Sequence, residues 1–460
     1  MSPAAAPWIP ALVILAAALF APQVLNDGDT FSHIATGHWI LAHRAIPTTD
    51  PFSHSFAGAP WVAHEWLAEV MLALADAAAG WSGTVALTVA AAALAFFNLA
   101  RHLGRFLPPG PTLLLVLLAA ASVAPGMLVR PHILALPAFE AWIAGLLIAC
   151  AAGRAPPWRL LPLMCLWANL HGGFILGLLL VPPLALEAAL AEPARARQTL
   201  TRWGAFLAAA TLAALLTPHG LTGLLFPFQL AAMPELSGIG EWRPTDFGTL
   251  QPLEIILLAG TYVALTRGAR LPPIRLLLTL GLLHLALTHT RHQALFGLIV
   301  PLLIAEPLGR AIAPPAPRPA GRWHMIALTC AALLLTTRLA LPITRTDGPT
   351  APIAAIAALP ADLAGQNVLN DYAFGGYLIF AGIPPFIDGR ADMYGPAFLR
   401  RYAAIIHPNR DTLDDTIRHY HIGWTLLSPA NPAVDLLDLL PGWCRRYTDP
   451  TAVIHAPCAK

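Results

Sequence analysis

Two acidic residues, Asp27 and Asp29, lie one residue apart directly after the first apolar stretch of the chain. Acidic side chains are scarce in this sequence, because only 11% of its residues are charged and 57% are hydrophobic. A pair of carboxylates where a chain leaves a membrane can act as a general base, hold a metal ion or bind a sugar. The alternative is a solvated helix end, a common setting for acidic residues in loops.

Further polar side chains gather at the ends of the other apolar stretches. The candidates for substrate binding are His33, His64 and Glu65 in the first loop, then Arg130, His132, Asn169, His171, His219, Arg291 and His292 at later turns. Each has a structural alternative, such as an interfacial anchor for Arg130 or a helix cap for His171. Charged groups in a membrane protein usually face a cavity or water. Their recurrence at several turns therefore favours a shared polar site.

The elements that must position these residues are predicted to be membrane helices. The mean hydropathy of +0.63 over 460 residues is too high for one soluble core. Apolar runs of about 15 to 22 residues recur instead, which is typical of an all-α polytopic membrane protein. The predicted spans, about eleven in number, are 8–25, 83–100, 111–128, 132–152, 160–170, 173–190, 203–217, 252–266, 276–289, 293–309 and 323–341. Residues 64–79 and 221–233 are predicted to be interfacial helices because they are amphipathic or short.

The arginines predict how these helices are oriented. Most of them, such as Arg101, Arg154 and Arg195, fall in one alternate set of loops, whereas the opposite loops hold only Arg44, Arg130, Arg243 and Arg291. The positive-inside rule makes the first set cytoplasmic. The N-terminus is then cytoplasmic, the long first loop 26–82 and the C-terminal part lie outside, and residues 8–25 are a retained helix. The composition, rich in alanine and arginine, favours a bacterial inner (plasma) membrane, and the net charge of +2 suggests no nucleic-acid partner.

The character of the sequence changes after residue 342. Residues 1–342 are predicted to form the membrane domain, and 343–460 a small extracytoplasmic α/β domain. Its predicted strands are 367–370, 385–387 and 424–427, and its predicted helices are 396–406, 412–419 and 434–440. An oxidising compartment would permit a disulfide between Cys444 and Cys458. Within this domain Asp388, Arg390, Asp392 and Tyr394 form the densest polar cluster, which either binds ligand or contains an ion pair of Asp388 with Arg390.

Several kinds of chemistry find little support in the sequence. HExxH and CxxC are absent, so the many histidines leave a divalent metal possible and no cofactor certain. No GxSxG elbow appears, and the glycine pair at Gly375 lacks the lysine of a phosphate loop. Carboxylates, arginines and histidines on one outer face suit a reaction on an anionic lipid-linked donor, since arginine pairs with phosphate and a carboxylate takes a proton from a hydroxyl.

With these features the chain resembles the GT-C superfamily of polytopic glycosyltransferases, which use polyprenyl-phosphate sugars. The segment from Asp27 to Ala35 is similar to the acidic, aromatic and Ile-Ala pattern of the branch of protein mannosyltransferases and aminoarabinose transferases. The segments 47–53, 61–67, 167–173, 375–377 and 387–390 resemble an uncharacterised bacterial subgroup of that superfamily. One departure is Gly28, which stands where the mannosyltransferase branch has glutamate.

The resemblance implies an inverting transfer of a sugar from a polyprenyl-phosphate donor to a hydroxyl of a glycan, lipid or protein acceptor. Its first acid, Asp27, would be the catalytic base, and Asp29 is the alternative because of Gly28. Arg130 and Arg291 would stabilise the leaving phosphate, and the histidines with Glu65 would shape the sugar and acceptor site.

Two other functions remain open from the sequence. A transporter or flippase of a lipid-linked sugar would explain the arginines without chemistry, but it predicts repeat symmetry and charged residues near the middle of the membrane, and we identify neither. A non-catalytic partner in envelope polysaccharide assembly would have the same fold.

Overall fold

The computed structural model describes residues 7–458 apart from 234–239, 269, 313–322 and 408. The chain forms two compact units, which we call the helical unit and the mixed unit. The helical unit comprises Met1–Ala21, Ser82–Pro227 and Ser237–Pro342, and the mixed unit comprises Pro22–Trp81, Phe228–Leu236 and Ile343–Lys460. One division falls between residues 342 and 343, and residues 22–81 group with the C-terminal region rather than with the other helices.

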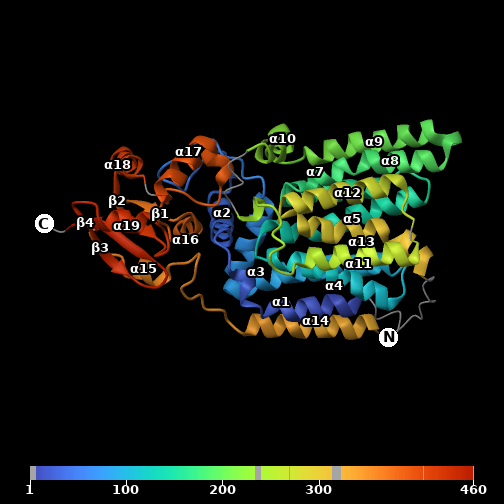
Figure 1. Ribbon diagram of the computed structural model, residues 1–460, viewed down its shortest axis with the longest axis horizontal. Coiled ribbons are helices and arrows are strands. Elements are labelled where there is room, and N and C mark those ends of the chain that lie inside the picture. The colour runs from blue at the N-terminus through green and yellow to red at the C-terminus, as the bar shows by residue number, and fades with distance from the viewer. Residues whose placement is uncertain (1–6, 234–239, 269, 313–322, 408, 459–460) are drawn as a thin grey trace. The chain divides into compact units, whose positions relative to one another are not determined.

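The helical unit is built from apolar helices that run alongside one another (Figure 1). They are α1 Trp8–Leu19, the later part of α3 Trp66–Leu103, α4 Pro109–Val123, α5 Pro131–Ala151, α6 Leu161–Leu170, α7 Phe174–Leu179, α8 Val181–Ala191, α9 Ala196–Ala214, α11 Pro252–Arg267, α12 Pro273–Thr288, α13 His292–Ile312 and α14 Trp323–Ala340. Helix α10, Gly220–Ala231, begins in this unit. Buried aromatic side chains such as Trp142, Trp167 and Phe206 fill the space between helices.

Six of the described helical segments are long and apolar enough to cross a membrane: Trp66–Leu103, Pro109–Gly126, Pro131–Ala151, Phe174–Ala191, His292–Ile312 and Trp323–Ala340. Three shorter apolar helices, Trp8–Leu19, Gly220–Ala231 and Pro273–Thr288, fall below that length. The predicted number of about eleven spans is therefore not confirmed. The predicted span 160–170, for example, is a ten-residue helix; at 1.5 Å per residue it covers about half of a hydrocarbon core of about 30 Å.

Helix α3 changes direction where the sequence analysis divides an interfacial helix from a membrane span. Ala79 and Gly80 have non-helical backbone angles, and Gly80 has a φ of 56°. Glycine adopts this left-handed conformation without the steric penalty of a side chain. The predicted helix 64–79 is thus a separate helical segment, although its place relative to a membrane stays a prediction.

The mixed unit contains a four-stranded sheet in the order β1-β2-β4-β3. Its strands are β1 Asn367–Asn370, β2 Ile422–Leu427, β3 Trp443–Thr448 and β4 Val453–Pro457. β1 and β2 are parallel, and the other two pairs are antiparallel. The helices of the unit are α2 Asp29–His43, the beginning of α3, α15 Ile353–Ala357, α16 Gly375–Phe380, α17 Ala391–Ile406, α18 Arg410–His419 and α19 Ala433–Asp438. The predicted α/β domain is confirmed in its strands at 367–370 and 424–427.

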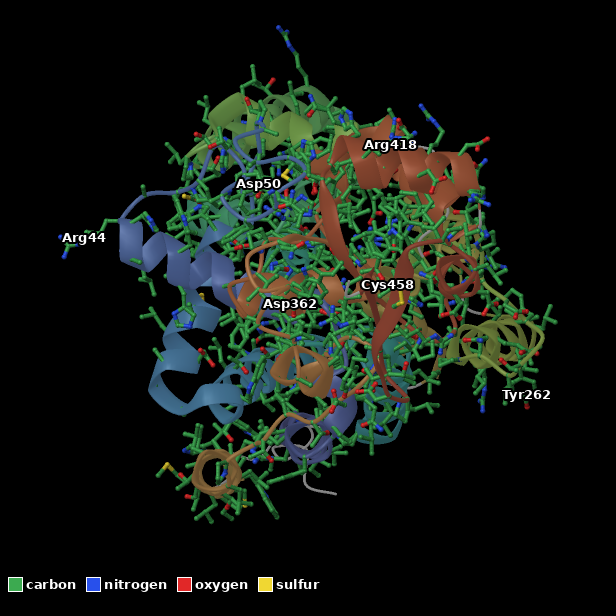
Figure 2. All side chains as sticks on the ribbon, turned by 90° about the vertical axis from the view of Figure 1, so that its left-hand side faces the viewer. Arg44, Asp50, Tyr262, Asp362, Arg418 and Cys458 are labelled. Atoms are coloured by element: carbon green, nitrogen blue, oxygen red, sulfur yellow. A yellow bond between two sulfur atoms is a disulfide. The ribbon has the colours of Figure 1, made fainter. Side chains whose placement is uncertain are left out.

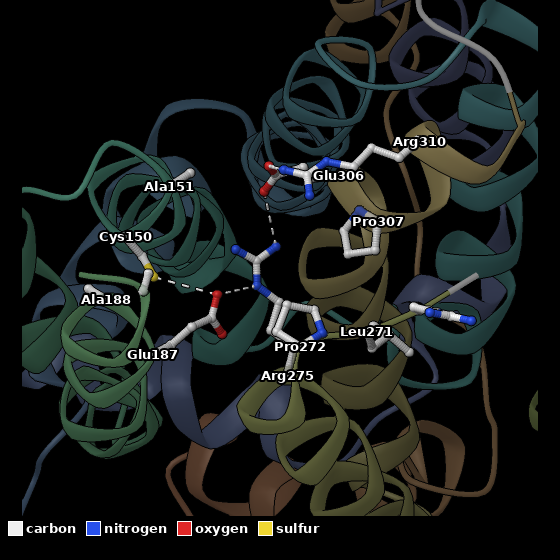
Figure 3. A pocket seen from close by; sticks show the side chains of 12 residues that line it. Cys150, Ala151, Glu187, Ala188, Leu271, Pro272, Arg275, Glu306, Pro307 and Arg310 are labelled. Atoms are coloured by element: carbon white, nitrogen blue, oxygen red, sulfur yellow. Dashed lines mark hydrogen bonds and ion pairs between the residues drawn. The ribbon is translucent and has the colours of Figure 1, made fainter. Parts of the chain in front are cut away.

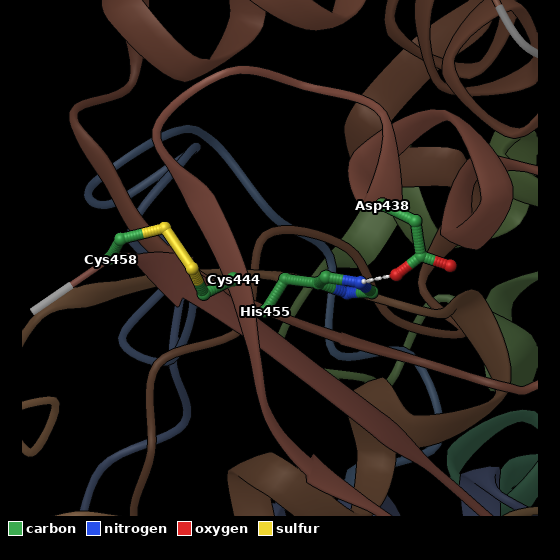
Figure 4. The surroundings of a disulfide bond; sticks show 4 residues. All are labelled: Asp438, Cys444, His455 and Cys458. Atoms are coloured by element: carbon green, nitrogen blue, oxygen red, sulfur yellow. Dashed lines mark hydrogen bonds and ion pairs between the residues drawn. A yellow bond between two sulfur atoms is a disulfide. The ribbon is translucent and has the colours of Figure 1, made fainter.

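The predicted strand 385–387 is wrong. The backbone N–H groups of Phe386 and Ile387 donate to the side-chain oxygen of Asn370, at 2.7 and 3.4 Å, instead of to a neighbouring strand. A buried asparagine thus satisfies these backbone donors without a ladder. The sequence analysis also missed β3 and β4. Cys444 in β3 and Cys458, the residue after β4, form a disulfide (Figure 4).

Candidate active site

The acidic pair lies at the beginning of α2, within the mixed unit. Asp27 is 7% exposed, and its Oδ2 accepts hydrogen bonds from the backbone N–H of Thr30 at 3.0 Å and from the Thr30 hydroxyl at 3.2 Å. This arrangement satisfies a backbone donor in the first turn of the helix, as a capping aspartate does. Because both bonds end on one oxygen, they hold the carboxylate in one orientation. Asp29, the first residue of α2, is partly exposed.

The acidic motif packs against two glycine motifs of the C-terminal region. A Cβ atom at Gly376 would lie 2.0 Å from the backbone oxygen of Gly28, and a Cβ at Gly389 would lie 1.8 Å from Oδ1 of Asp29. Real Cβ atoms do not approach other heavy atoms so closely, so the backbone of Gly28 excludes a side chain at position 376, and a side chain at position 389 would displace the Asp29 carboxylate. The C-terminal motifs therefore contact the backbone and carboxylate of the acidic motif directly, although some 350 residues separate them in sequence.

His33 lies between Glu69 of α3 and Glu65, the residue before that helix. Its Nδ1 is 3.1 Å from Oε1 of Glu69, and its Nε2 is 3.9 Å from Oε2 of Glu65. Burial by itself lowers the pKa of the imidazole, but the hydrogen bond to Glu69 and the charges of Glu65, Glu69 and Asp29 outweigh burial and raise the pKa to about 9. The site thus holds an imidazolium among carboxylates at neutral pH.

His33 is expected to make protein stability fall as pH rises. Its pKa in the folded protein, about 9, lies above the ordinary 6.5, so its contribution is complete below pH 6.5 and is lost as pH rises through about 9. The difference corresponds to on the order of 3 kcal/mol. Thermal unfolding of the wild type should shift downward across this interval, whereas His33→Gln should give a flatter profile. His43→Gln, at the exposed end of α2, is the matched control, and equal profiles for wild type and His33→Gln would contradict the assignment.

A buried ionic network joins the first loop to the C-terminal region. Arg390 donates to both oxygens of Asp388, at 2.8 and 2.7 Å, and to Oδ1 of Asp50 at 2.6 Å. The Tyr394 hydroxyl donates to Asp388 at 2.6 Å. Burial would raise the pKa of Asp388, but the Arg390 charge and these hydrogen bonds hold it below its usual value. The predicted ion pair of Asp388 with Arg390 is present, and the Asp50 contact was not anticipated.

The position of Asp50 contrasts with that of Arg44 on the same loop. Figure 2 shows Arg44 projecting away from the ribbon at the end of α2, whereas Asp50 is buried, with 3% of its surface exposed. The network therefore holds the loop that follows α2 in place beside Gly389, the residue before Arg390.

Two further titratable residues lie near this site. His64 lies 3.7 Å from Glu65 through its Nε2. Asp392, in the first turn of α17, has a pKa raised by burial and lowered in part by the charge of His64. Four of the predicted site residues, Asp29, His33, His64 and Glu65, are thus linked to one another by contacts or charge, and Asp27 is two residues from the first of them.

In the helical unit, the two residues that are predicted to bind phosphate, Arg130 and Arg291, contact the same carboxylate. Nη1 of Arg130 lies 3.6 Å from Oε2 of Glu241, and Nη1 of Arg291 lies 3.2 Å from Oε1 of the same residue. The Arg291 guanidinium also stacks on Trp242, with 4.3 Å to the ring centroid. Two arginines around one anionic group form the kind of arrangement that binds phosphate.

The remaining predicted site residues also lie in the helical unit, mainly at helix ends. The rings of His132 and His171 are 6.1 Å apart, and Nδ1 of His171 accepts from the backbone N–H of Gly173. Asn169 donates to the backbone oxygens of Cys165 and Leu216, and His292 packs edge-on against His289. His219 lies before α10 and is partly exposed. His171 and Asn169 thus hydrogen-bond to backbone groups, as expected if their roles are structural.

Four important contacts escaped the sequence analysis: Glu69 with His33, Gly389 with Asp29, Asp50 with Arg390, and Glu241 with its two arginines. For Glu69, a signal was available, because it lies with Asp76 on the polar face of the predicted amphipathic helix 64–79. Among the residues that the structure describes, no group of three His, Cys, Asp or Glu side chains is arranged to hold a metal ion.

No protein-family profile and no curated protein sequence matches the chain, so the comparison with known proteins rests on solved structures. ArnT from Cupriavidus metallidurans bound to undecaprenyl phosphate superposes with a TM-score of 0.55 and 13% identity, over 98% of each chain. The archaeal oligosaccharyltransferase AglB from Archaeoglobus fulgidus, in complex with an inhibitory peptide and a dolichol-phosphate, superposes with a TM-score of 0.53 and 11% identity, over 92% of this chain and 69% of that one. A second structure of the Archaeoglobus enzyme, in complex with Zn and sulfate, gives 0.54 and 12%, over 92% and 68%.

These similarities define the class of the fold. The chain shares the fold of these structures, with described apolar helices of which six are long enough to cross a membrane and with a small C-terminal sheet domain. This is the fold that the predicted resemblance implies. At 11–13% identity they do not assign an activity to this chain.

Proposed function

We propose that the chain is a membrane glycosyltransferase that moves a sugar from a polyprenyl-phosphate donor to an acceptor hydroxyl, with inversion at the anomeric carbon. The observation that carries the proposal is the carboxylate pair at the start of α2. Asp27 is held by Thr30, and Asp29 packs against Gly389. It occurs in a fold shared with two transferases whose structures contain dolichol-phosphate and undecaprenyl phosphate.

Asp27 is the proposed general base. The hydrogen bonds from the Thr30 backbone and hydroxyl fix the orientation of its carboxylate. The acceptor O–H gives its proton to Asp27, the acceptor oxygen forms a bond to the anomeric carbon, and the bond from that carbon to the phosphate oxygen breaks. Polyprenyl phosphate leaves with the electron pair. Asp29 and the His33 imidazolium are the proposed groups that orient the acceptor or sugar hydroxyls.

The zinc-containing neighbour raises the question of a divalent metal. The described side chains, as placed, do not form a metal site, and the proposed step uses the chain's own groups. The acceptor class stays open among a glycan, a lipid and a protein. The proposed location is a bacterial inner membrane, with the N-terminus in the cytoplasm and the mixed unit outside, as the arginine distribution predicts.

Arg130 and Arg291 are proposed to bind the leaving phosphate, and Glu241 then occupies the place that an anion would take. Glu241→Gln is expected to tighten binding of undecaprenyl phosphate several-fold, because the phosphate no longer displaces a like-charged carboxylate from two guanidinium groups. Glu192→Gln, which alters an exposed pair with Arg195, is the matched control. Native mass spectrometry of the purified protein with undecaprenyl phosphate provides the measurement. Weaker binding in Glu241→Gln would mean that Glu241 positions the arginines instead.

One observation favours the transporter as a second candidate. Glu140 lies in the middle of α5, is 1% exposed, and has no hydrogen-bond partner for either carboxylate oxygen among the described residues. The expectation that no charged residue lies near the middle of a span is therefore wrong. Ionisable groups at that depth commonly mark transport pathways.

A radiolabelled polyprenyl-phosphate sugar, supplied to the purified protein in vesicles, separates the candidate functions. A glycosyltransferase consumes the donor and releases polyprenyl phosphate, and Asp27→Asn abolishes this. A transporter moves the intact lipid across the bilayer, and Glu140→Gln, not Asp27→Asn, stops that movement. Neither consumption nor movement would leave the non-catalytic partner and contradict the proposed enzyme.

A further inference from the structure

A second polar site lies in the helical unit. A cavity of about 270 Å³ opens where α5, α8 and α13 end and α12 begins (Figure 3). Its lining includes Glu187, Arg270, Arg275, Glu306 and Arg310. This volume lies just below the usual range for sites of drug-sized ligands, which begins at about 300 Å³. It suits a group the size of a lipid headgroup.

An ionic brace forms the inner wall of the cavity. Arg275 is buried, and its guanidinium lies between two carboxylates, 2.8 Å from Oε1 of Glu187 and 3.4 Å from Oε2 of Glu306 (Figure 3). Oε1 of Glu306 also accepts from Arg310 at 2.5 Å. A purely structural brace would satisfy the groups it buries.

One buried carboxylate oxygen of this brace lacks a hydrogen-bond donor among the described residues. Oε2 of Glu187 is buried and, among the residues that the structure describes, has no hydrogen-bond partner. The Glu187 side chain is 13% exposed and lines the cavity. A buried carboxylate oxygen without a donor is costly, so this atom favours a ligand that brings N–H donors and positive charge.

The mouth of the cavity offers the opposite charge. Arg270 and Arg310 line it and are exposed, and the sixteen-residue helix α12 begins there, directing its N-terminal dipole toward the cavity. Guanidinium groups and a helix N-terminus together favour a phosphate. The cavity thus pairs an acceptor for an ammonium with donors for a phosphate, at the ends of apolar helices, where lipid headgroups lie.

We propose that this cavity binds the headgroup of a phospholipid that carries a primary ammonium, such as phosphatidylethanolamine. The ammonium donates to Oε2 of Glu187, and the phosphate accepts from Arg270 and Arg310. The cavity lies on the arginine-rich side of the helices, which the charge distribution predicts to be cytoplasmic. The site is independent of the proposed transfer reaction and would hold a bilayer lipid rather than the donor.

A nearby arginine cluster supplies an internal comparison. Arg195, Arg197 and Arg202 line a separate depression together with Gln198 and Thr201. Such a surface attracts anionic lipids through charge alone. A preference for an ammonium-bearing headgroup is therefore the property that distinguishes the Glu187 cavity from general attraction to arginines.

The test is native mass spectrometry of the purified, delipidated full-length protein with short-chain phosphatidylethanolamine, phosphatidylglycerol or phosphatidylcholine. The wild type is expected to retain phosphatidylethanolamine about tenfold better than the other two, because phosphatidylglycerol lacks the ammonium and phosphatidylcholine lacks N–H donors. Glu187→Gln keeps the shape and the acceptor for Arg275 but is expected to erase this preference. Ala151→Leu, at the exposed rim of the cavity, is expected to reduce retention by filling space. Arg197→Ala is the matched control and should leave the preference intact.

Thermal unfolding and gel filtration establish that each variant is folded, and Arg310→Ala provides a second polar test at the cavity mouth. Equal retention of phosphatidylethanolamine and phosphatidylglycerol by the wild type would overturn the proposal in favour of general charge attraction. A preference that survives Glu187→Gln would overturn it as well. Free phosphoethanolamine and inorganic phosphate are tested in parallel, and equally strong binding of either would assign the cavity to a soluble phosphate instead of a lipid.

Discussion

Asp27→Asn is expected to lower sugar transfer by about 10²–10⁴-fold, the usual contribution of a general base, while leaving the melting temperature of the protein unchanged. The amide oxygen of asparagine keeps both hydrogen bonds from Thr30, and asparagine caps helices as well as aspartate does. The substitution therefore removes the base without removing the cap. Release of polyprenyl phosphate from a radiolabelled donor measures the first effect, and thermal unfolding measures the second.

Two further variants make the Asp27 prediction specific. Asp27→Ala should lose transfer equally and also lose about 1 kcal/mol of stability, because the Thr30 donor then has no cap. Asp29→Asn should reduce transfer less than Asp27→Asn, since Asp29 is proposed to orient hydroxyls in company with His33. If Asp29→Asn abolished transfer and Asp27→Asn retained it, the two roles would have to be exchanged. Full activity in both variants would rule out the mechanism.

Gly389→Ala is expected to reduce transfer by about 100-fold, although it adds a single methyl group in the C-terminal region. The new Cβ would lie 1.8 Å from Oδ1 of Asp29, so the carboxylate must move, and a misplacement of about 1 Å at a catalytic centre costs on that order. The backbone at Gly389 does not require a positive φ, so the chain itself tolerates alanine. Gly348→Ala, where a Cβ meets nothing within 4 Å, is the control in the same unit.

A double-mutant cycle tells whether Gly389 acts through Asp29. If it does, Gly389→Ala should add little to the loss already caused by Asp29→Asn, because the displaced carboxylate is then no longer the functional group. Additive losses would mean that alanine damages the site by another route, such as the buried network of Arg390 with Asp388 and Asp50. Sugar transfer is compared only between variants that have the same thermal stability.

The C-terminal region therefore has a proposed role beyond binding an acceptor. Its glycines contact Gly28 and Asp29, and its Arg390 binds Asp50 of the first loop. Deleting residues 346–460 is expected to abolish donor hydrolysis as well as transfer, because the acidic motif would lose the surface that shapes it. Hydrolysis that persists after the deletion would restrict the region to acceptor binding.

Much of the architecture was predictable because it depends on local patterns. Long apolar runs separate membrane helices from the C-terminal α/β region, and the strands at 367–370 and 424–427 stand out as short apolar segments. The placement of Asp27 and Asp29 directly after an apolar run was visible in the sequence, but the helix α2 that begins at Asp29 was not predicted. The number of membrane-crossing helices was not predicted either, because short helices such as α6 and α7 have apolar composition without the length.

The sequence by itself determined which residues are candidates for chemistry and which long apolar runs form helices. Only the tertiary structure decided that Gly389 touches Asp29, that Glu69 binds His33, and that Glu241 joins Arg130 to Arg291. Arg390 and Asp50 are 340 residues apart in the chain. The physical reason is that hydropathy and helix caps are properties of neighbouring residues, whereas these contacts exist only once distant segments have packed at close range.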